Sequence, residues 1–373
     1  MRATATIAAG RTQAPPSAAD SGDAHPLRRA RLVSILTAAV LTACGTASSA
    51  TPAVTDSGPV TLRFGYFPNL THATALVGVQ KGFLASALGS NVTLENHTFN
   101  AGPEEVTSLL SGALDAGFLG PNPAVNAYVQ SHGEAVRIIA GGSSGGALLV
   151  VKPSIASPSD LRGKMIADPQ LGGTQDIALR WYLKNQGLNT DAAGGGDVHV
   201  LPQENATTLT AFRQGQVDGA WLPEPWASRL IVEGGAKVLV DERDLWPGGK
   251  FITTNLVVRT EFLKAHPGTV HRLLEGLYTT NAYLNSNPAE SQAAVNSAIA
   301  LVTGKALAAN VMSGAWTHMT FTLDPLAASL KASADHQGKV GLTSSSIPLK
   351  GIYDLKLLNE VLSENQVSTV SGL

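Results

Sequence analysis

"EEVTSLLSGALDAGFL" spans residues 104–119 and "TTLTAFRQGQVDGAWL" spans residues 207–222, at an ungapped offset of 103 residues. The two stretches share three residue types at matching places: Gly112 and Gly215, Asp115 and Asp218, and Leu119 and Leu222. Each stretch predicts a helix that ends near the glycine, followed by a strand that begins at the aspartate. The chain therefore contains a repeated helix–strand unit.

A second pair of stretches lies at the same offset. "LRFGYFPNLTHATAL" begins at Leu62 and "MIADPQLGGTQDIAL" begins at Met165. Each predicts a strand, then a loop that contains proline, then a helix that begins at a threonine, which is Thr71 or Thr174. Because two separated blocks share one offset, we interpret them as two copies of a β-α-β-α unit.

Two such units predict an α/β fold with two Rossmann-like lobes, each built on a mostly parallel sheet. Extended runs at residues 145–153 and 251–262 are expected to cross between the lobes as a two-strand hinge. The first lobe is predicted to comprise residues 60–150 and 257–373, and the second lobe residues 151–256. The extra C-terminal helices should pack around the first lobe.

A basic and apolar segment precedes the repeats. Three arginines come before an apolar run at residues 32–41, which is too short to span a bilayer but has the length of a secretory signal. "LTAC" at residues 41–44 resembles the lipobox of bacterial lipoproteins, which implies acylation of Cys44. We therefore expect a signal region at residues 1–43, a flexible tether at residues 44–59, and a lipid anchor on the outer side of the cell membrane. The alternative is a free cysteine buried in a helix.

Composition excludes some classes of partner. The 373 residues carry a formal net charge of −2, and no strongly basic stretch indicates nucleic acid. Cys44 is the only cysteine, so an internal disulfide is impossible. No segment after residue 59 is long and apolar enough to span a membrane. These features are typical of an exported protein that contacts the membrane through its anchor alone.

Loops after the predicted strands are the candidate binding site, because ligands of open α/β sheets bind beyond the carboxyl ends of the strands. Several of these loops begin helices, whose free N–H groups and partial positive charge favour an anion without lysine or arginine. The loops span residues 69–72, 120–128, 141–146, 171–176 and 223–226. Hydroxyl donors are expected from Thr71, Ser143, Ser144 and Thr174, and close backbone approach from glycines such as Gly173.

Other roles remain open for several of these residues. Thr71, Asn122 and Thr174 could serve only as helix caps. Glu224 could bind an amine of the ligand or accept a backbone N–H group. Trp226 follows a predicted strand and is placed to form a wall of the pocket.

Several motifs together resemble the solute-binding proteins of nitrate, taurine and aliphatic-sulfonate ABC importers. They are "GYFPN", "LSGALDAG", "GPNPA", "GGSSGGALLVVK", "DLRGKMIADPQLGGTQD" and "WLPEPW", within residues 60–270. The resemblance implies a type II periplasmic-binding fold with an anion held between the lobes, and an ABC permease and ATPase as partners. It implies ligand contacts at Asn69, His72, Asn122, Ser143, Ser144, Thr174, Gln175 and Trp226. We further expect a monomer without a cofactor or metal.

Three alternative functions compete with solute binding for import. A G-x-S-x-G pattern at residues 141–145 is followed by a strand-like run, whereas a nucleophile elbow needs a helix there. Pyrimidine-precursor synthases share this fold but use a cysteine-rich iron site, for which this chain lacks ligands, so we predict no enzyme. A ligand-sensing lipoprotein for a signalling receptor stays open. Among solutes, the aromatic and glycine-rich pocket favours an aliphatic sulfonate or taurine, with nitrate as the alternative.

Overall fold

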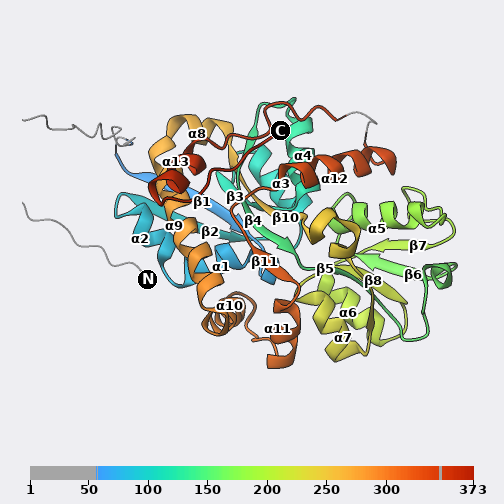
Figure 1. The fold of residues 1–373 in the computed structure, drawn as a ribbon. Coiled ribbons are helices and arrows are strands. Elements are labelled where there is room, and N and C mark those ends of the chain that lie inside the picture. Colours follow the sequence, from blue (N-terminus) through green and yellow to red (C-terminus); the bar gives the residue numbers. More distant parts are fainter. Residues whose placement is uncertain (1–55, 57, 344–346) are drawn as a thin grey trace, which may run out of the picture. The chain divides into compact units, whose positions relative to one another are not determined.

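The computed structural model describes Asp56, residues 58–343 and residues 347–373 (Figure 1). Its strands form two separate sheets, and helices pack against each sheet. This architecture confirms the predicted α/β fold with two lobes. The predicted signal region at residues 1–43 and the lipidation site at Cys44 lie outside the described residues.

The first lobe is built on a six-stranded sheet. Its strands are β1 (Val60–Tyr66), β2 (Val92–Thr98), β3 (Ala116–Leu119), β4 (Val136–Gly145), β10 (Ile252–Arg259) and β11 (Met319–Phe321). They are ordered β11-β4-β10-β3-β1-β2. β1 is parallel to β2 and β3, whereas β10 is antiparallel to β3 and β4.

The second lobe is built on a five-stranded sheet with the same arrangement. Its strands are β5 (Ala147–Val151), β6 (Met165–Asp168), β7 (His199–Pro202), β8 (Gly219–Pro223) and β9 (Lys237–Asp241). Their order is β7-β6-β8-β5-β9, with β6 parallel to β7 and β8, and β5 antiparallel to β8 and β9. Apart from β11, the two sheets therefore match strand for strand, as the repeat predicts.

The repeated glycines end equivalent helices. α3 (Gly102–Leu110) and α6 (Asn205–Arg213) each end two residues before a glycine in the left-handed region. These are Gly112 with a φ of 78° and Gly215 with a φ of 77°. Glycine adopts this conformation without the strain that a side chain would add, which explains its presence at both positions.

The repeated aspartates join neighbouring strands. Oδ2 of Asp115 accepts the backbone N–H of Arg63 at 3.0 Å, and Oδ2 of Asp218 accepts that of Met165 at 3.0 Å. Each carboxylate thus ties the strand that follows it to the parallel strand beside it. The two residues have a structural role in the lobes.

The chain passes between the sheets at two places. The first passage is at Gly145 and Gly146, between β4 and β5, and the second is through η3 (Glu242–Leu245) and η4 (Pro247–Gly249), between β9 and β10. The predicted boundaries after residues 150 and 256 therefore fall inside β5 and β10. The run at residues 145–153 is continuous in the sequence because the bend at Gly145 and Gly146 leaves its apolar pattern unchanged. The run at residues 251–262 does not cross between the sheets, because it forms β10 and the start of α8 after the chain has already crossed.

Helices of the two lobes follow the strands of each repeat. Besides α3, the first lobe contains η1 (Leu70–His72), α1 (Ala73–Gln80), α2 (Phe83–Leu88) and α4 (Pro121–Gln130). Besides α6, the second lobe contains η2 (Pro158–Leu161), α5 (Thr174–Asn185) and α7 (Trp226–Gly234).

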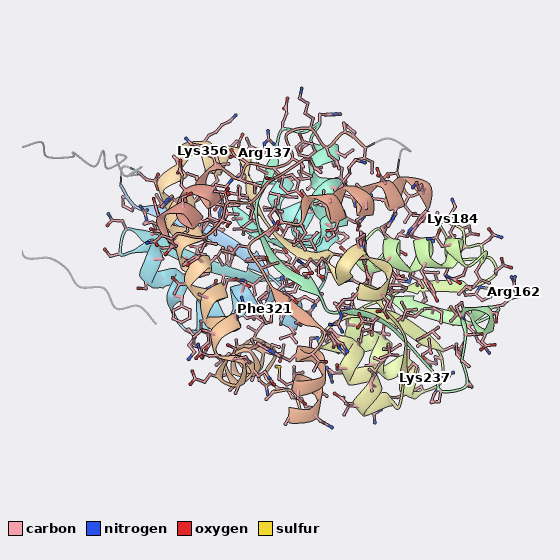
Figure 2. The ribbon with its side chains drawn as sticks, in the orientation of Figure 1. Arg137, Arg162, Lys184, Lys237, Phe321 and Lys356 are labelled. Atoms are coloured by element: carbon pink, nitrogen blue, oxygen red, sulfur yellow. The ribbon has the colours of Figure 1, made fainter. Side chains whose placement is uncertain are left out.

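The C-terminal helices contact both lobes, which corrects the expectation that they surround only the first. They are α8 (Thr260–Ala265), α9 (Pro267–Ser286), α10 (Pro288–Thr303), α11 (Ala309–Trp316), α12 (Ala327–Lys339) and α13 (Lys356–Glu364). α9, α10 and α13 pack into the core of the first lobe, but α11 packs against α7, and α12 lies against both α4 and α5. Lys184 of α5, labelled in Figure 2, donates from Nζ to the carbonyl of Lys339 at 2.5 Å.

Asp56 belongs to the folded part of the chain, although it falls within the predicted tether. Its Oδ1 accepts the N–H of Gly268 at 3.1 Å, and its Oδ2 accepts the N–H of Thr269 at 2.6 Å. The carboxylate thereby satisfies free N–H groups at the start of α9. Among the described residues, no helix has the length and apolar character needed to cross a membrane.

Candidate functional site

A cavity lies between the two lobes, beyond the carboxyl ends of β1, β3, β6 and β8. It holds about 490 Å³ of space, including its opening. The described residues that line it include no Asp, Glu, Lys or Arg. The predicted ligand-binding residues that line it are Asn69, Thr71, His72, Gly173, Thr174 and Gln175. An anion in this cavity would therefore be held by neutral donors and dipoles.

The N-terminal end of α5 faces the cavity. Gly173 is the N-cap residue and Thr174 is the first helical residue, so the N–H groups of the first turn have no partner within the helix. Asp176 accepts the N–H of Gly172 at 2.8 Å and forms a buried ion pair with Arg180 at 2.5 Å. Because Arg180 balances the charge of Asp176, the partial positive charge of the helix end remains available to a ligand.

Thr174 places an unpaired hydroxyl group in the cavity. The alternative that it only caps α5 is wrong, because Gly173 occupies the N-cap position. Oγ1 of Thr174 is buried, and no other group in the described part of the chain forms a hydrogen bond with it. A Cβ atom added at Gly120 of the first lobe would lie 2.2 Å from this Oγ1. The absence of a side chain at Gly120 thus allows the hydroxyl to approach the opposite lobe.

His72 offers a neutral N–H group to the cavity. Its ring stacks on Phe67 with 4.2 Å between the ring centroids, and its Nδ1 accepts the N–H of Phe67 at 3.2 Å. Burial lowers the pKa of His72 to about 3, so the ring is neutral near pH 7. Since Nδ1 is an acceptor, the proton of the neutral ring lies on Nε2, which becomes a donor.

Thr71 lies in η1 and does not cap a helix, because Asn69 and His72 are the N-cap residues of η1 and α1. Its carbonyl group accepts the hydroxyl of Ser143 at 2.7 Å. Thr71 and Thr174, which the repeat places at equivalent positions, therefore line one cavity from opposite lobes.

Asp168 is a buried carboxyl group at the end of β6, close to α5. Burial, together with the charge of Asp176, raises the pKa of Asp168 well above its usual range. Its Oδ1 accepts the N–H of Gln170 at 3.1 Å. The environment therefore shifts the Asp168 carboxyl group towards its protonated form.

Ser143 and Ser144 do not line the cavity. The segment predicted as a loop at residues 141–146 forms the end of β4 up to Gly145, and it pairs with both β10 and β11. Glycine permits this packing, because a Cβ at Gly141 would lie 2.3 Å from the carbonyl oxygen of Asp324. The loop prediction is wrong for residues 141–144, where Gly141 allows close packing, whereas Gly145 and Gly146 form the bend that leads to β5.

Asn122 joins two helices of the structure. Its Nδ2 donates to Oε1 of Gln337 at 2.9 Å, and its Oδ1 accepts the hydroxyl of Ser333 at 2.8 Å. The side chain is fully buried between α4 and α12 and makes no cap bond. The expectation that Asn122 caps a helix beside the ligand is therefore wrong.

Glu224 is fully buried and does not line the cavity. Its carboxylate accepts the N–H and the hydroxyl of Ser228 in the first turn of α7, at 3.0 and 2.9 Å. Nδ1 of His318 lies 2.7 Å from Oε1 of the same carboxylate. This geometry favours the structural role over binding of a ligand amine.

Trp226 lies outside the cavity. Its Nε1 donates to Oδ1 of Asn69 at 3.0 Å, and its ring borders two further hollows on the surface. The prediction that Trp226 forms a wall of the cavity is therefore wrong, because its side chain contacts Asn69, which lines the cavity, and does not line the cavity itself.

Sequence reasoning missed several residues of the cavity. Oγ1 of Thr254 on β10 is buried, and the described structure provides no hydrogen-bond partner for it. Gly102 and Asn205, which begin α3 and α6, also line the cavity and differ by the repeat offset of 103. Extending the repeat to these helix starts would have found them, whereas Thr254 has no signal that distinguishes it from other strand residues.

The family model of the NMT1-like family matches residues 55–300, which is more than half of the chain. The chain therefore belongs to the NMT1-like family. A similar protein is the taurine-binding periplasmic protein of Escherichia coli (strain K12), which is 29% identical over 199 residues. That alignment covers 53% of this chain and 60% of the relative, so it spans less than two thirds of the relative's length.

Solved structures confirm the fold class. The alkanesulfonate-binding protein SsuA from Xanthomonas axonopodis pv. citri, bound to MOPS, has a TM-score of 0.66 at 22% identity, covering 79% of this chain and 98% of that one. The nitrate-binding protein NrtA from Synechocystis PCC 6803 has a TM-score of 0.73 at 12% identity, covering 84% and 92%. Both are named as binding proteins, as is the taurine-binding relative, in agreement with the prediction of no enzymatic activity.

Proposed function

We propose that this chain is the solute-binding component of an ABC importer and captures a small sulfonate, such as an alkanesulfonate or taurine, between its lobes. The observation that carries the proposal is a cavity in which neutral donors from both lobes converge and whose described lining residues include no Asp, Glu, Lys or Arg. Nitrate is the alternative solute of the same class.

The head group would be bound by donors from both lobes, of which the hydroxyls of Thr174 and Thr254 have no hydrogen-bond partner among the described residues. The first lobe offers Nε2–H of His72 and the hydroxyl of Thr254, and the second lobe offers the hydroxyl of Thr174 and the N-terminal end of α5. A helix N-terminus is suited to an oxyanion, because its N–H groups and dipole act together. Thr71 and Gln175 are further candidate contacts for the sulfonate oxygens.

The taurine-binding relative and the alkanesulfonate-binding structural neighbour favour an organic sulfonate over nitrate.

A calorimetric titration of the purified protein with ethanesulfonate, taurine, nitrate, sulfate and a phosphonate tests this proposal. We expect a sulfonate to bind tightest and to raise the melting temperature. The proposal is overturned if none of these anions binds while an uncharged or cationic solute does.

The proposed location is the outer side of the cell membrane, with Cys44 acylated, and the partners are a permease and an ATPase that act on a monomer. Cys44→Ser should abolish membrane fractionation and labelling with a fatty acid. A variant that remains in the membrane fraction to the same extent would contradict the lipid anchor.

A further inference from the structure

The cavity adjoins a second hollow, which we call the outer pocket. Its walls include Phe99, Glu204 and Trp226. Three asparagines, Asn69, Asn100 and Asn205, line both the cavity and the outer pocket. These three residues therefore lie where the two hollows meet, whereas the donors proposed for the head group line the cavity alone.

Asn205 carries an unpaired polar group at this junction. It is the first residue of α6 and its side chain is 7% exposed. Its Oδ1 is buried, and nothing in the described ranges donates a hydrogen bond to it. Buried polar groups are nearly always paired. The Oδ1 atom of Asn205 is therefore available to accept a hydrogen bond from a ligand.

The amide of Asn69 is fixed in orientation. Its Oδ1 accepts the indole N–H of Trp226 at 3.0 Å, which directs the Nδ2 group of the same amide elsewhere. Asn69 is 5% exposed and lines both the cavity and the outer pocket. Together with Asn205, it offers both a donor and an acceptor at the junction.

Charge differs between the two hollows. Glu204 is the one charged residue among the described residues that line the outer pocket, whereas the cavity contains none. A carboxylate at this end favours a cationic or neutral group of a ligand over a second anionic group. The site therefore has one end suited to an oxyanion and another suited to a hydrogen-bond donor.

We propose that Asn69, Asn100 and Asn205 form a second subsite that binds an amino or hydroxyl group at the far end of a sulfonate. The preferred solute is then an ω-substituted sulfonate, such as taurine or 2-hydroxyethanesulfonate, rather than a plain alkanesulfonate. This inference rests on the proposed sulfonate function.

Calorimetric titration of the wild-type protein with matched ligands tests the subsite. Taurine and 2-hydroxyethanesulfonate should bind about tenfold tighter than ethanesulfonate, as expected for one additional hydrogen bond in a buried site. Equal affinities for all three would overturn the second subsite while leaving the proposed function intact. If no sulfonate binds, the proposed function itself fails.

Asn205→Ala and a control variant test whether Asn205 causes the difference in affinity between taurine and ethanesulfonate. Asn205→Ala should weaken binding of taurine about tenfold and leave ethanesulfonate unchanged. Asn91→Ala, at an exposed position before β2, is the matched control and should change neither affinity. If Asn205→Ala weakens both ligands equally, Asn205 binds the head group or supports the fold, and the proposal is wrong.

Asn205→Asp provides a second measurement that does not depend on removing a side chain. It keeps the size of the residue and adds a negative charge, which a helix N-terminus tolerates. The ratio of taurine affinity to ethanesulfonate affinity should rise, because the carboxylate attracts the ammonium group. An unchanged or smaller ratio would contradict the placement of the amino group beside Asn205.

Discussion

Trp226 donates its indole N–H to Oδ1 of Asn69 at 3.0 Å, and the two residues belong to different lobes. Trp226 begins α7 of the second lobe, whereas Asn69 follows β1 of the first lobe. The guanidinium group of Arg229 lies 4.5 Å from the centroid of the indole ring. This hydrogen bond joins the lobes where the cavity meets the outer pocket, so we expect it to slow the release of a bound solute.

Trp226→Phe removes the indole N–H and keeps an aromatic ring. A hydrogen bond of this kind contributes about 1 kcal/mol, so the dissociation rate should rise about fivefold while the association rate stays nearly unchanged. The measurement is a chase of labelled taurine from the preloaded protein.

Trp316→Phe is the matched control, because the indole N–H of Trp316 has no hydrogen-bond partner within the described structure and its ring packs against Phe321 in the first lobe. It should leave the dissociation rate at the wild-type value. An equal acceleration in both variants would assign the effect to general loosening of the protein instead.

Gly120→Ala should prevent full closure of the lobes. The new methyl group would lie 2.2 Å from Oγ1 of Thr174, far inside the contact distance, so one lobe must move away. The φ of Gly120 is −64°, which alanine adopts without strain, so the lobes themselves should remain folded. We expect at least about tenfold weaker binding, equivalent to about 1.4 kcal/mol.

X-ray scattering and a double variant check this explanation. The wild type should become more compact when solute is added, and Gly120→Ala should become less so. Gly120→Ala combined with Thr174→Ala should bind no worse than Thr174→Ala alone, because the clashing hydroxyl is gone. Additive losses in the double variant would show that the two residues act independently.

His72 should make the stability of the protein depend on pH. Burial lowers its pKa to about 3, whereas histidine in an unfolded chain titrates near 6.5. Between these values the unfolded state binds more protons, so the free energy of unfolding falls as the pH decreases from about 6.5. At pH 5 the loss that His72 causes should be about 2 kcal/mol.

Urea denaturation at pH 7 and pH 5 isolates this contribution. His72→Gln keeps hydrogen-bonding groups but does not titrate, so its loss of stability between the two pH values should be smaller by about 2 kcal/mol. His97→Gln, at an exposed position on β2, should behave as the wild type does. Identical pH dependence in His72→Gln and the wild type would exclude His72 as the cause.

The parts of the fold that could be predicted are those that depend on local backbone requirements. Gly112 and Gly215 need a left-handed conformation, and Asp115 and Asp218 bind backbone groups of the neighbouring strand, so each repeat leaves the same pattern in the sequence. The lobes and the helix start at Thr174 follow from that pattern. The positions at which the chain changes sheets do not, because an extended run continues through the bend at Gly145 and Gly146.

The parts of the site that were missed depend on contacts between distant residues. Asn122 is held by α12, more than 200 residues later, and no pattern near Asn122 reveals that partner. Similarly, only the packing of the two lobes shows that Trp226 donates a hydrogen bond to Asn69. Local sequence therefore identifies helix starts that face the cavity, but tertiary packing decides which side chains remain free for a ligand.

Thr174 provides the most direct test of the anion site. Its buried hydroxyl has no partner among the described residues and lines the cavity beside the free N–H groups of α5. A hydrogen bond to a charged oxygen contributes about 1.5–3 kcal/mol, so Thr174→Ala should weaken sulfonate binding about ten- to a hundredfold. Because Gly173 is the N-cap, the substitution removes no cap bond, and the melting temperature without solute should change little. Thr174→Ser retains the hydroxyl and should bind nearly as the wild type does. Unchanged sulfonate affinity in folded Thr174→Ala would show that this hydroxyl does not contact the solute.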